Sequence, residues 1–160
     1  MTDAIFSSNV ASSGADIVLW TGETPDSVLE TGAREYSVAE ARAIVSGFAE
    51  VTTSLDINTF VRGFTEDCIV SFNEHAEMKG REAVRQLMGP RFDHLAAPGS
   101  GFICRKTSRS LTSNVFGVIW LNDWVDAKAG RPMRSKGVEF WVMKDSRIAR
   151  WDCSFTAWPT

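Results

Sequence analysis

The sequence has few of the residues that mark disulfide frameworks or metal centres. Its 160 residues include three cysteines, two histidines and one tyrosine. Cys68, Cys104 and Cys153 form no CxxC motif, which argues against a disulfide framework and indicates free thiols in a reducing cytoplasm. The two histidines lie far apart and the cysteines are isolated, so the sequence predicts no metal site.

Runs of basic residues and long apolar runs are also absent from the sequence. No lysine or arginine precedes Arg34, so the basic region of a signal peptide is missing, and no apolar run is long enough to span a membrane. The net charge of -3 gives no general attraction to nucleic acid or to anionic membranes. Because glycine-rich phosphate loops and the Gly-x-Ser-x-Gly motif are absent as well, we expect no cofactor.

Aromatic residues are abundant, with six tryptophans and ten phenylalanines. An apolar fraction of 44% and a charged fraction of 23% are typical of a soluble globular domain. The rings are expected to fill its core, and some could also line a ligand cavity. Residues 1–36 are rich in Ser, Gly, Thr and Asp and are predicted to form a flexible arm with one apolar segment, IVLW at 17–20. Residues 37–160 are predicted to form one domain.

Helical signals dominate the first half of this domain. Ser37 and Glu40 form a capping-box pattern, and apolar residues at helical spacing follow, which predicts a helix over 38–53. Asp56 can cap a second, shorter helix. These signals place two helices at the start of the domain.

A strand and a third helix follow. The run CIVSF at 68–72 is typical of a strand, and residues 81–88 have the spacing of a helix. Pro90 should kink or end this helix, because proline lacks the N–H group and clashes with the preceding turn. The apolar side could continue to Phe92 beyond the kink.

The periodicity then changes from helical to alternating. Four segments read as strands, and a polar turn, DAKAGRP, separates the middle two: 102–111, 115–126, 133–143 and 148–155. A run of helices followed by a run of strands indicates an α+β fold. Three N-terminal helices would pack on a curved, mainly antiparallel sheet.

This element order resembles the cystatin-like cone (an α+β roll) of the nuclear-transport-factor-2-like superfamily, which includes SnoaL-like polyketide cyclases and ketosteroid isomerases. The segment MKGREAVRQLM is similar to that superfamily's third helix, and VMKDSRIARW is similar to its closing hairpin. The stretches NEHAEMKGRE, WLNDWVD and RSKGVEFW are similar to motifs of a bacterial SnoaL-like subfamily of unknown function. The resemblance covers about residues 38–158, and it implies a small-molecule cone and a homodimer.

Pairing the two middle strands places Glu139 on an aromatic face. If Asp126 faces Met133, then Trp120 faces Glu139. Alternation then puts one set of side chains toward the cone and another toward the outside. The first set is Val118, Trp120, Asn122, Trp124, Glu139 and Trp141. The second set is Ile119, Leu121, Asp123, Val138 and Phe140.

Glu139 is the leading candidate for a catalytic residue. An aromatic wall with a few polar groups is typical of small-molecule cavities. Burial in such a wall disfavours the ionised form of a carboxyl group, which suits it to act as a general acid or base. The alternative is that Glu139 forms an ion pair with Arg134, Arg150 or another arginine and serves structure only.

Three further polar residues are candidates for the catalytic site. Asn122 would be a second polar group in the cone. His75 could point into the mouth of the cone as a base, or could lie in a surface turn. Asp152 could project into the cone or pair with an arginine. The candidate ligand contacts are Trp120, Trp124, Trp141, Trp151, Phe72 and Phe60.

The resulting hypothesis is a cofactor-independent enzyme that performs isomerisation, dehydration, cyclisation or hydrolysis on a small apolar organic molecule. The alternative is a non-catalytic binding module, for a ligand or for a protein partner. A homodimer through the outer face of the sheet is compatible with both, because an apolar outer face needs cover.

Overall fold

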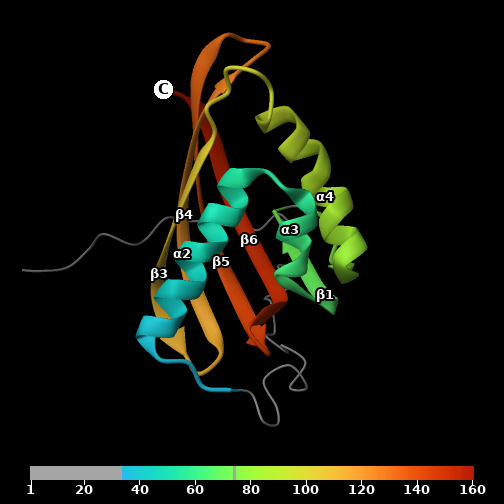
Figure 1. Ribbon diagram of the computed structural model, residues 1–160, viewed down its shortest axis with the longest axis vertical. Coiled ribbons are helices and arrows are strands. Elements are labelled where there is room, and N and C mark those ends of the chain that lie inside the picture. The colour runs from blue at the N-terminus through green and yellow to red at the C-terminus, as the bar shows by residue number, and fades with distance from the viewer. Residues whose placement is uncertain (1–33, 74) are drawn as a thin grey trace, which may run out of the picture.

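A computed structural model describes residues 34–73 and 75–160. Three helices cover one face of a curved six-stranded sheet, and the opposite face carries no helix in the described part of the chain (Figure 1). The elements are α2 (Val38–Ser54), α3 (Ile57–Arg62), β1 (Phe64–Phe72), β2 (Met78–Lys79), α4 (Gly80–Leu95), β3 (Ile103–Thr112), β4 (Val115–Asp126), β5 (Arg131–Lys144) and β6 (Arg147–Pro159). The predicted α+β cone is confirmed.

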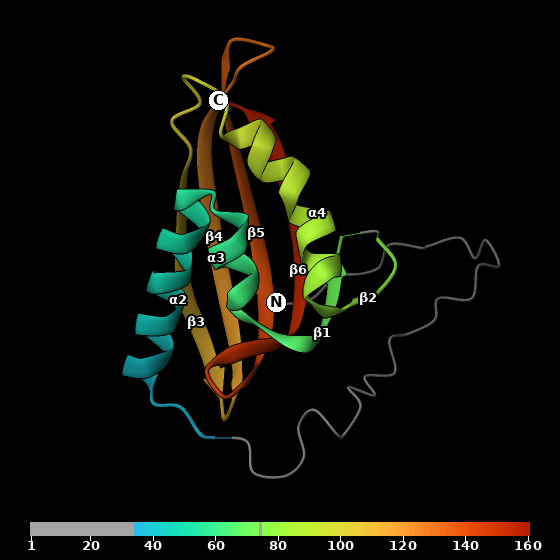
Figure 2. The same cartoon turned by 45° about the vertical axis from the view of Figure 1, so that its right-hand side comes forward.

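The sheet has the order β2-β1-β6-β5-β4-β3. Strands β3 to β6 form an antiparallel meander, and β1 pairs in parallel with β6. Helix α2 lies along β3, and α4 contacts β1 (Figure 2). The concave face of the sheet and the three helices therefore enclose the core.

The capping signals at the first two helices are confirmed. The Ser37 hydroxyl accepts a hydrogen bond from the Glu40 amide at 3.2 Å, and the Glu40 carboxylate accepts one from the Ser37 amide at 2.9 Å. The Asp56 carboxylate accepts hydrogen bonds from the amides of Asn58 and Thr59. These caps satisfy backbone donors that the first turn leaves unpaired.

The predicted end of the third helix is wrong. Helix α4 continues through Pro90 to Leu95. Proline at this position removes the hydrogen bond to the carbonyl group of residue 86 and crowds that carbonyl group, which costs about 3 kcal/mol. Phe92, which follows it, is 2% exposed, and we attribute the continuation of the helix to the burial of this ring.

The predicted register of the β4–β5 hairpin is wrong by two residues. Asp126 pairs with Arg131, so Trp120 faces Gly137 and Val118 faces Glu139. The loop is shorter than expected because the Asp126 carboxylate accepts hydrogen bonds from the amides of Lys128 and Ala129, which closes a tight turn. Side chains alternate with a period of two, so the slip preserves the predicted faces.

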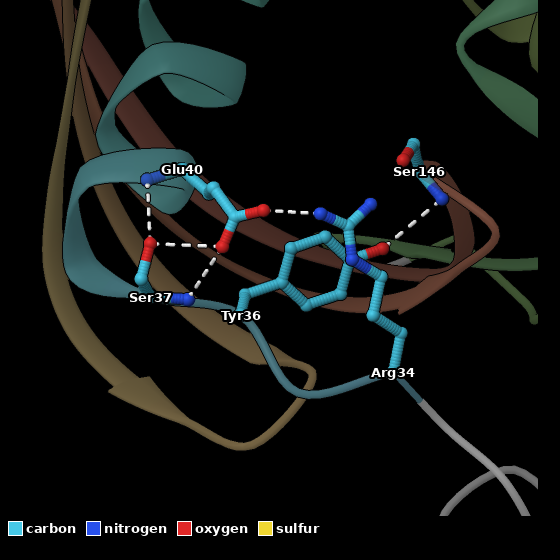
Figure 3. A network of polar contacts seen from close by, with 5 residues as sticks. All are labelled: Arg34, Tyr36, Ser37, Glu40 and Ser146. Atoms are coloured by element: carbon cyan, nitrogen blue, oxygen red, sulfur yellow. Dashed lines mark hydrogen bonds and ion pairs between the residues drawn. The ribbon is translucent and has the colours of Figure 1, made fainter.

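Tyr36 fastens the start of the described chain to the domain (Figure 3). Its hydroxyl accepts a hydrogen bond from the Ser146 amide at 3.0 Å, and its ring packs edge-on against Phe116. Arg34 forms an ion pair with Glu40 beside it. The predicted arm at 1–36, including the segment at 17–20, otherwise lies outside the described residues.

No helix in the described ranges is both long enough and apolar enough to cross a membrane.

Candidate functional site

A cavity of about 370 Å³ lies between the three helices and the concave face of the sheet. Its walls are mainly aromatic, with rings contributed by α3, α4, β1, β4 and β6 and by Phe102, which precedes β3. Five of the six predicted ligand contacts line it: Phe60, Phe72, Trp120, Trp124 and Trp151. The sixth, Trp141, is fully buried and is not part of the wall.

Glu139 lines the cavity and forms an ion pair with Lys106 of β3. The Lys106 ammonium donates to both carboxylate oxygens, at 2.8 Å and 2.9 Å. The side chains of Lys106 and Glu139 are only 5% and 2% exposed. The indole N–H of Trp141 donates to Glu139 Oε2 at 2.8 Å, so the buried tryptophan also supports the carboxylate.

Sequence reasoning missed Lys106 and considered only arginines as partners of Glu139. Strand β3 pairs Lys106 with Trp120, and its alternation turns Cys104 and Lys106 toward the cavity. The signal was present in ICRKTSRS, where alternation separates Arg105 from Lys106. It could not be used without knowing which face of this strand is buried.

Aromatic rings surround the Lys106 ammonium. Its Nζ atom lies 5.5 Å from the ring centroid of Trp120, 5.7 Å from that of Trp141 and 5.9 Å from that of Phe48. The negative faces of such rings attract a cation at these distances. The ammonium is therefore stabilised by one carboxylate and by three aromatic rings around it.

Two thiols lie beside this charge pair. Cys153 Sγ is 3.8 Å from Glu139 Oε1, and Cys104 lines the cavity. Burial raises the pKa of Cys104 to about 11, and burial together with the Glu139 charge raises the pKa of Cys153. Both thiols are free, as is Cys68, and they are protonated at neutral pH, so neither is an activated nucleophile.

Asn122 lines the cavity further along β4, directly opposite Ser135 of β5. Between this pair and Glu139 lies Gly137. A Cβ atom on Gly137 would lie 2.5 Å from two atoms of the Trp120 indole, so the absence of a side chain leaves room for this ring next to the backbone of β5. The Trp120 ring thus forms the floor between the two polar positions.

The other two candidates for catalysis lie outside the cavity wall. His75 is exposed, and its amide donates to the Phe72 carbonyl group in a turn after β1. Asp152 accepts hydrogen bonds from Arg150 at 2.9 Å and 3.1 Å, which is the arginine pairing that was the alternative for it. A different histidine, His94 of α4, lines the cavity instead and lies 3.7 Å from Asp126.

Within residues 34–73 and 75–160, no cluster of three His, Cys, Asp or Glu side chains is arranged to hold a metal ion. The polar side chains of the cavity wall are instead the Lys106–Glu139 ion pair, three tryptophans and six further residues: Thr52, Arg91, His94, Cys104, Asn122 and Ser135. Such a set can bind and polarise an oxygen atom and can move a proton.

The sequence matches no protein-family model. It also matches no curated protein. The resemblance to a bacterial SnoaL-like subfamily therefore rests on the motifs alone at the sequence level.

Solved structures, in contrast, give clear matches. The epoxide hydrolase/cyclase-like enzyme SalBIII, with a role in pyran ring formation in the polyether salinomycin, aligns with a TM-score of 0.61 and 12% identity, over 74% of this chain and 92% of SalBIII. A candidate isomerase from Bacillus subtilis aligns with a TM-score of 0.61 and 16% identity, over 76% and 90% of the two chains.

A candidate polyketide cyclase from Pseudomonas putida aligns with a TM-score of 0.55 and 13% identity, over 72% of this chain and 91% of the cyclase. At identities this low, the structural alignments establish only a shared fold. The chemistry has to be argued from the residues of the site. The chain shares the α+β cone fold of these three proteins, and its helix-then-strand order had predicted the α+β class.

Proposed function

We propose that this protein is a cofactor-independent enzyme that performs acid–base chemistry on a small, mostly apolar organic molecule. The observation that carries this proposal is the buried Lys106–Glu139 ion pair in the wall of an aromatic cavity. Removing two charges from water costs free energy that their attraction only partly returns. A pair kept in a cavity at that cost supports a role in the chemistry of a bound molecule.

The hydrogen bonds of Glu139 distinguish its two oxygen atoms. Oε2 accepts from both Lys106 and Trp141, which occupies its two lone pairs. Oε1 accepts from Lys106 and faces only the weak thiol donor of Cys153 at 3.8 Å. We therefore assign Oε1 as the atom that takes a proton from the ligand.

Lys106 supplies the acidic partner. An ammonium group has three N–H donors, and hydrogen bonds to the two carboxylate oxygens use two of them. The third can donate to a carbonyl, ether or hydroxyl oxygen of the ligand. Charge that develops on this oxygen would be stabilised by a fixed cation in surroundings of low dielectric constant.

The two groups together account for a proton-transfer cycle. Glu139 Oε1 removes a proton from the carbon next to a carbonyl group, and the electron pair moves onto the carbonyl oxygen beside Lys106. In a substrate with a conjugated double bond, return of the proton from Glu139 to another carbon completes an isomerisation. In a substrate with a hydroxyl group on the β carbon, the electron pair returns from the oxygen, the carbon–hydroxyl bond breaks, and Glu139 gives its proton to the leaving hydroxyl, which departs as water. The names of the structural neighbours, which include a cyclase and an isomerase, support this class of chemistry.

Deuterium exchange into 2-tetralone tests the proposal without knowledge of the natural substrate. In D2O the protein should accelerate exchange of the hydrogens next to the carbonyl group, followed by NMR, by at least about a hundredfold over buffer. The double variant Lys106→Met/Glu139→Gln should reduce the rate to that of buffer. It removes both charges and so avoids the loss of about 3–5 kcal/mol expected when Glu139→Gln alone strands a buried ammonium.

The variant Asp152→Asn is the matched control, because it neutralises a carboxylate that lies outside the cavity and pairs with Arg150. It should retain the exchange activity. Exchange that persists in the folded double variant, or no acceleration by the wild-type protein, would overturn the proposed chemistry.

A non-catalytic ligand-binding module is the second candidate. It is favoured by the fact that Glu139 already accepts its hydrogen bonds from Lys106 and Trp141 without a ligand. Such a module would bind 2-tetralone without accelerating exchange. The same experiment, combined with calorimetry, therefore separates the two functions.

A further inference from the structure

Strand β3 forms one edge of the sheet, and in the described part of the chain no strand lies beyond it (Figure 2). The Thr53 hydroxyl accepts from the Cys104 amide at 3.0 Å and donates to the Cys104 carbonyl group at 3.3 Å. The backbone of Cys104 therefore points away from β4. Alternate residues of an antiparallel strand point the same way, so the N–H and C=O groups of Lys106 and Ser108 also face the outside of the sheet.

This unpaired stretch of β3 has a limit at each end. Thr53 occupies the backbone of Cys104 at one end, and the register of β3 against β4 shifts between Ser108 and Ser110 at the other. An irregularity of this kind terminates the pairing of an edge strand. Residues 105–109, which we call the free edge, therefore offer room for about four or five residues of a further strand.

A groove of about 550 Å³ lies between this part of β3 and α2. Short side chains line it on the α2 side: Ser46, Ala49 and Thr53. Cys104 and Lys106 line it on the β3 side, and both also line the aromatic cavity. Side chains of a strand added here would alternate, so every second one would enter the groove. Such a strand would brace the segment that carries Lys106, one half of the buried ion pair.

The chain itself supplies a segment of the right length. Residues 17–20, Ile-Val-Leu-Trp, precede the described residues and are rich in the β-branched and aromatic side chains that favour strands. Thirteen residues separate Trp20 from Arg34, and they can span about 40 Å. The Tyr36 amide donates to the Ser113 carbonyl group directly after β3, and Lys106 lies about 23 Å further along that strand. The segment can therefore reach the free edge.

The charges of the two partners are opposite. Residues 1–33 contain five of the 20 acidic residues and no basic residue, so the rest of the chain holds 15 acidic and all 17 basic residues. Asp16 precedes the apolar segment and Glu23 follows it. Arg105 and Arg109 lie at the two ends of the free edge and are exposed, and Arg109 has no hydrogen-bond or ion-pair partner among the described residues. Attraction between these charges favours docking at this place.

We propose that residues 17–20 add to the free edge of β3 as a short extra strand, with every second side chain in the groove beside α2. The outward N–H and C=O groups of Lys106 and Ser108 then gain backbone partners. The docking does not depend on the proposed chemistry, because it concerns the outer side of β3 and holds whether or not Glu139 transfers a proton.

Amide hydrogen exchange, followed by NMR on the full chain, tests the proposal. The amides of Lys106 and Ser108 should exchange at least about tenfold more slowly in the wild-type protein than in the double variant Val18→Pro/Leu19→Pro. Proline has no N–H group and is not tolerated where a strand pairs, and one of two consecutive prolines must face β3 in either alternation. The Thr107 amide, which faces β4, reports on the domain itself and should exchange equally slowly in both proteins.

Val10→Pro/Ala11→Pro is the matched control, because it places the same two prolines outside the apolar segment. It should leave the protection of the outward amides unchanged. Dilution and Phe140→Lys should leave it unchanged too, because the segment belongs to the same chain.

The proposal fails if the outward amides exchange as fast in the wild-type protein as in Val18→Pro/Leu19→Pro. It also fails if their protection survives the prolines, which would indicate a second copy paired edge to edge. Loss of protection on dilution or in Phe140→Lys would indicate a segment donated by another copy and would equally overturn docking within one chain.

Discussion

Gly137 of β5 determines where the Trp120 ring can lie in the cavity wall. The Trp120 indole occupies the space where a side chain would be, and a carbonyl oxygen of Ser154 lies 2.7 Å from the same point. The glycine therefore sets the depth of the cavity floor between Glu139 and Ser135.

We expect Gly137→Ala to destabilise the protein by about 1–3 kcal/mol and to weaken binding of 2-tetralone, because the new methyl group must push the Trp120 ring into the cavity. Urea unfolding and calorimetry measure the two effects. Gly89→Ala is the control, since nothing lies within 4 Å of a Cβ atom there and alanine favours the helix. Equal stability of Gly137→Ala and wild type would contradict the close contact.

The sequence was informative about Glu139 and silent about its partner. Alternation places Glu139 on the cavity face in any register that slips by an even number of residues, so an error of two residues did no harm to that prediction. Lys106 lies 33 positions earlier, on a strand that reaches Glu139 only across β4. No local pattern encodes a contact over that separation.

At the scale of elements, α2 depends on its capping box. The hydrogen bonds from Ser37 hold the pKa of Glu40 below its ordinary value of 4.5. A carboxyl group with a lowered pKa contributes stability that is present above its unfolded value and is lost as the pH falls through its folded value.

Ser37→Ala should therefore lower the free energy of unfolding by about 1 kcal/mol at pH 7. The difference from wild type should shrink as the pH falls below 4.5, when Glu40 takes up a proton. Thermal unfolding across this pH range measures both. Ser46→Ala, at an exposed position in the middle of the same helix, should cause no loss. A constant difference down to pH 2 would show that the hydrogen bond from the Ser37 hydroxyl does not contribute to the lowered pKa of Glu40, since the Ser37 amide, which alanine retains, also donates to this carboxylate.

Elements with a local signal were predicted well. The caps at Ser37 and Asp56 and the alternation of the last four strands each rest on residues close in sequence. The short strand β2 and the first half of β1 were missed, because pairing with other strands defines them. Helix α4 extends beyond its predicted end for a similar reason. The burial of Phe92, which we take to extend the helix, depends on contacts with residues distant in sequence, such as Phe60.

For the whole molecule, the convex face of the sheet remains uncovered by the described chain. Val138 and Phe140 are 46% and 54% exposed on it, although both are large and apolar. We propose that a second copy of the chain packs on this face, as the family resemblance implies. Arg105, Asp123 and Arg134 form ion pairs on the same face.

Phe140→Lys should then shift the protein from dimer to monomer, because a charge on this face would have to be buried on association. Light scattering after size-exclusion chromatography at micromolar concentrations measures the mass. Val38→Lys, at an apolar residue that is 55% exposed on α2, is the matched control and should remain dimeric. A wild-type protein with the mass of a monomer would contradict the proposed dimer.

The parallel pairing of β1 with β6 has a consequence for folding during synthesis of the chain. Val70 of the first long strand finds its sheet neighbour in Trp151 of the last one, and both strands contribute rings to the cavity wall. A chain still emerging from the ribosome lacks one wall until β6 has been made. Contacts so distant in sequence form slowly, so a ligand can stabilise the finished domain but cannot guide its early folding.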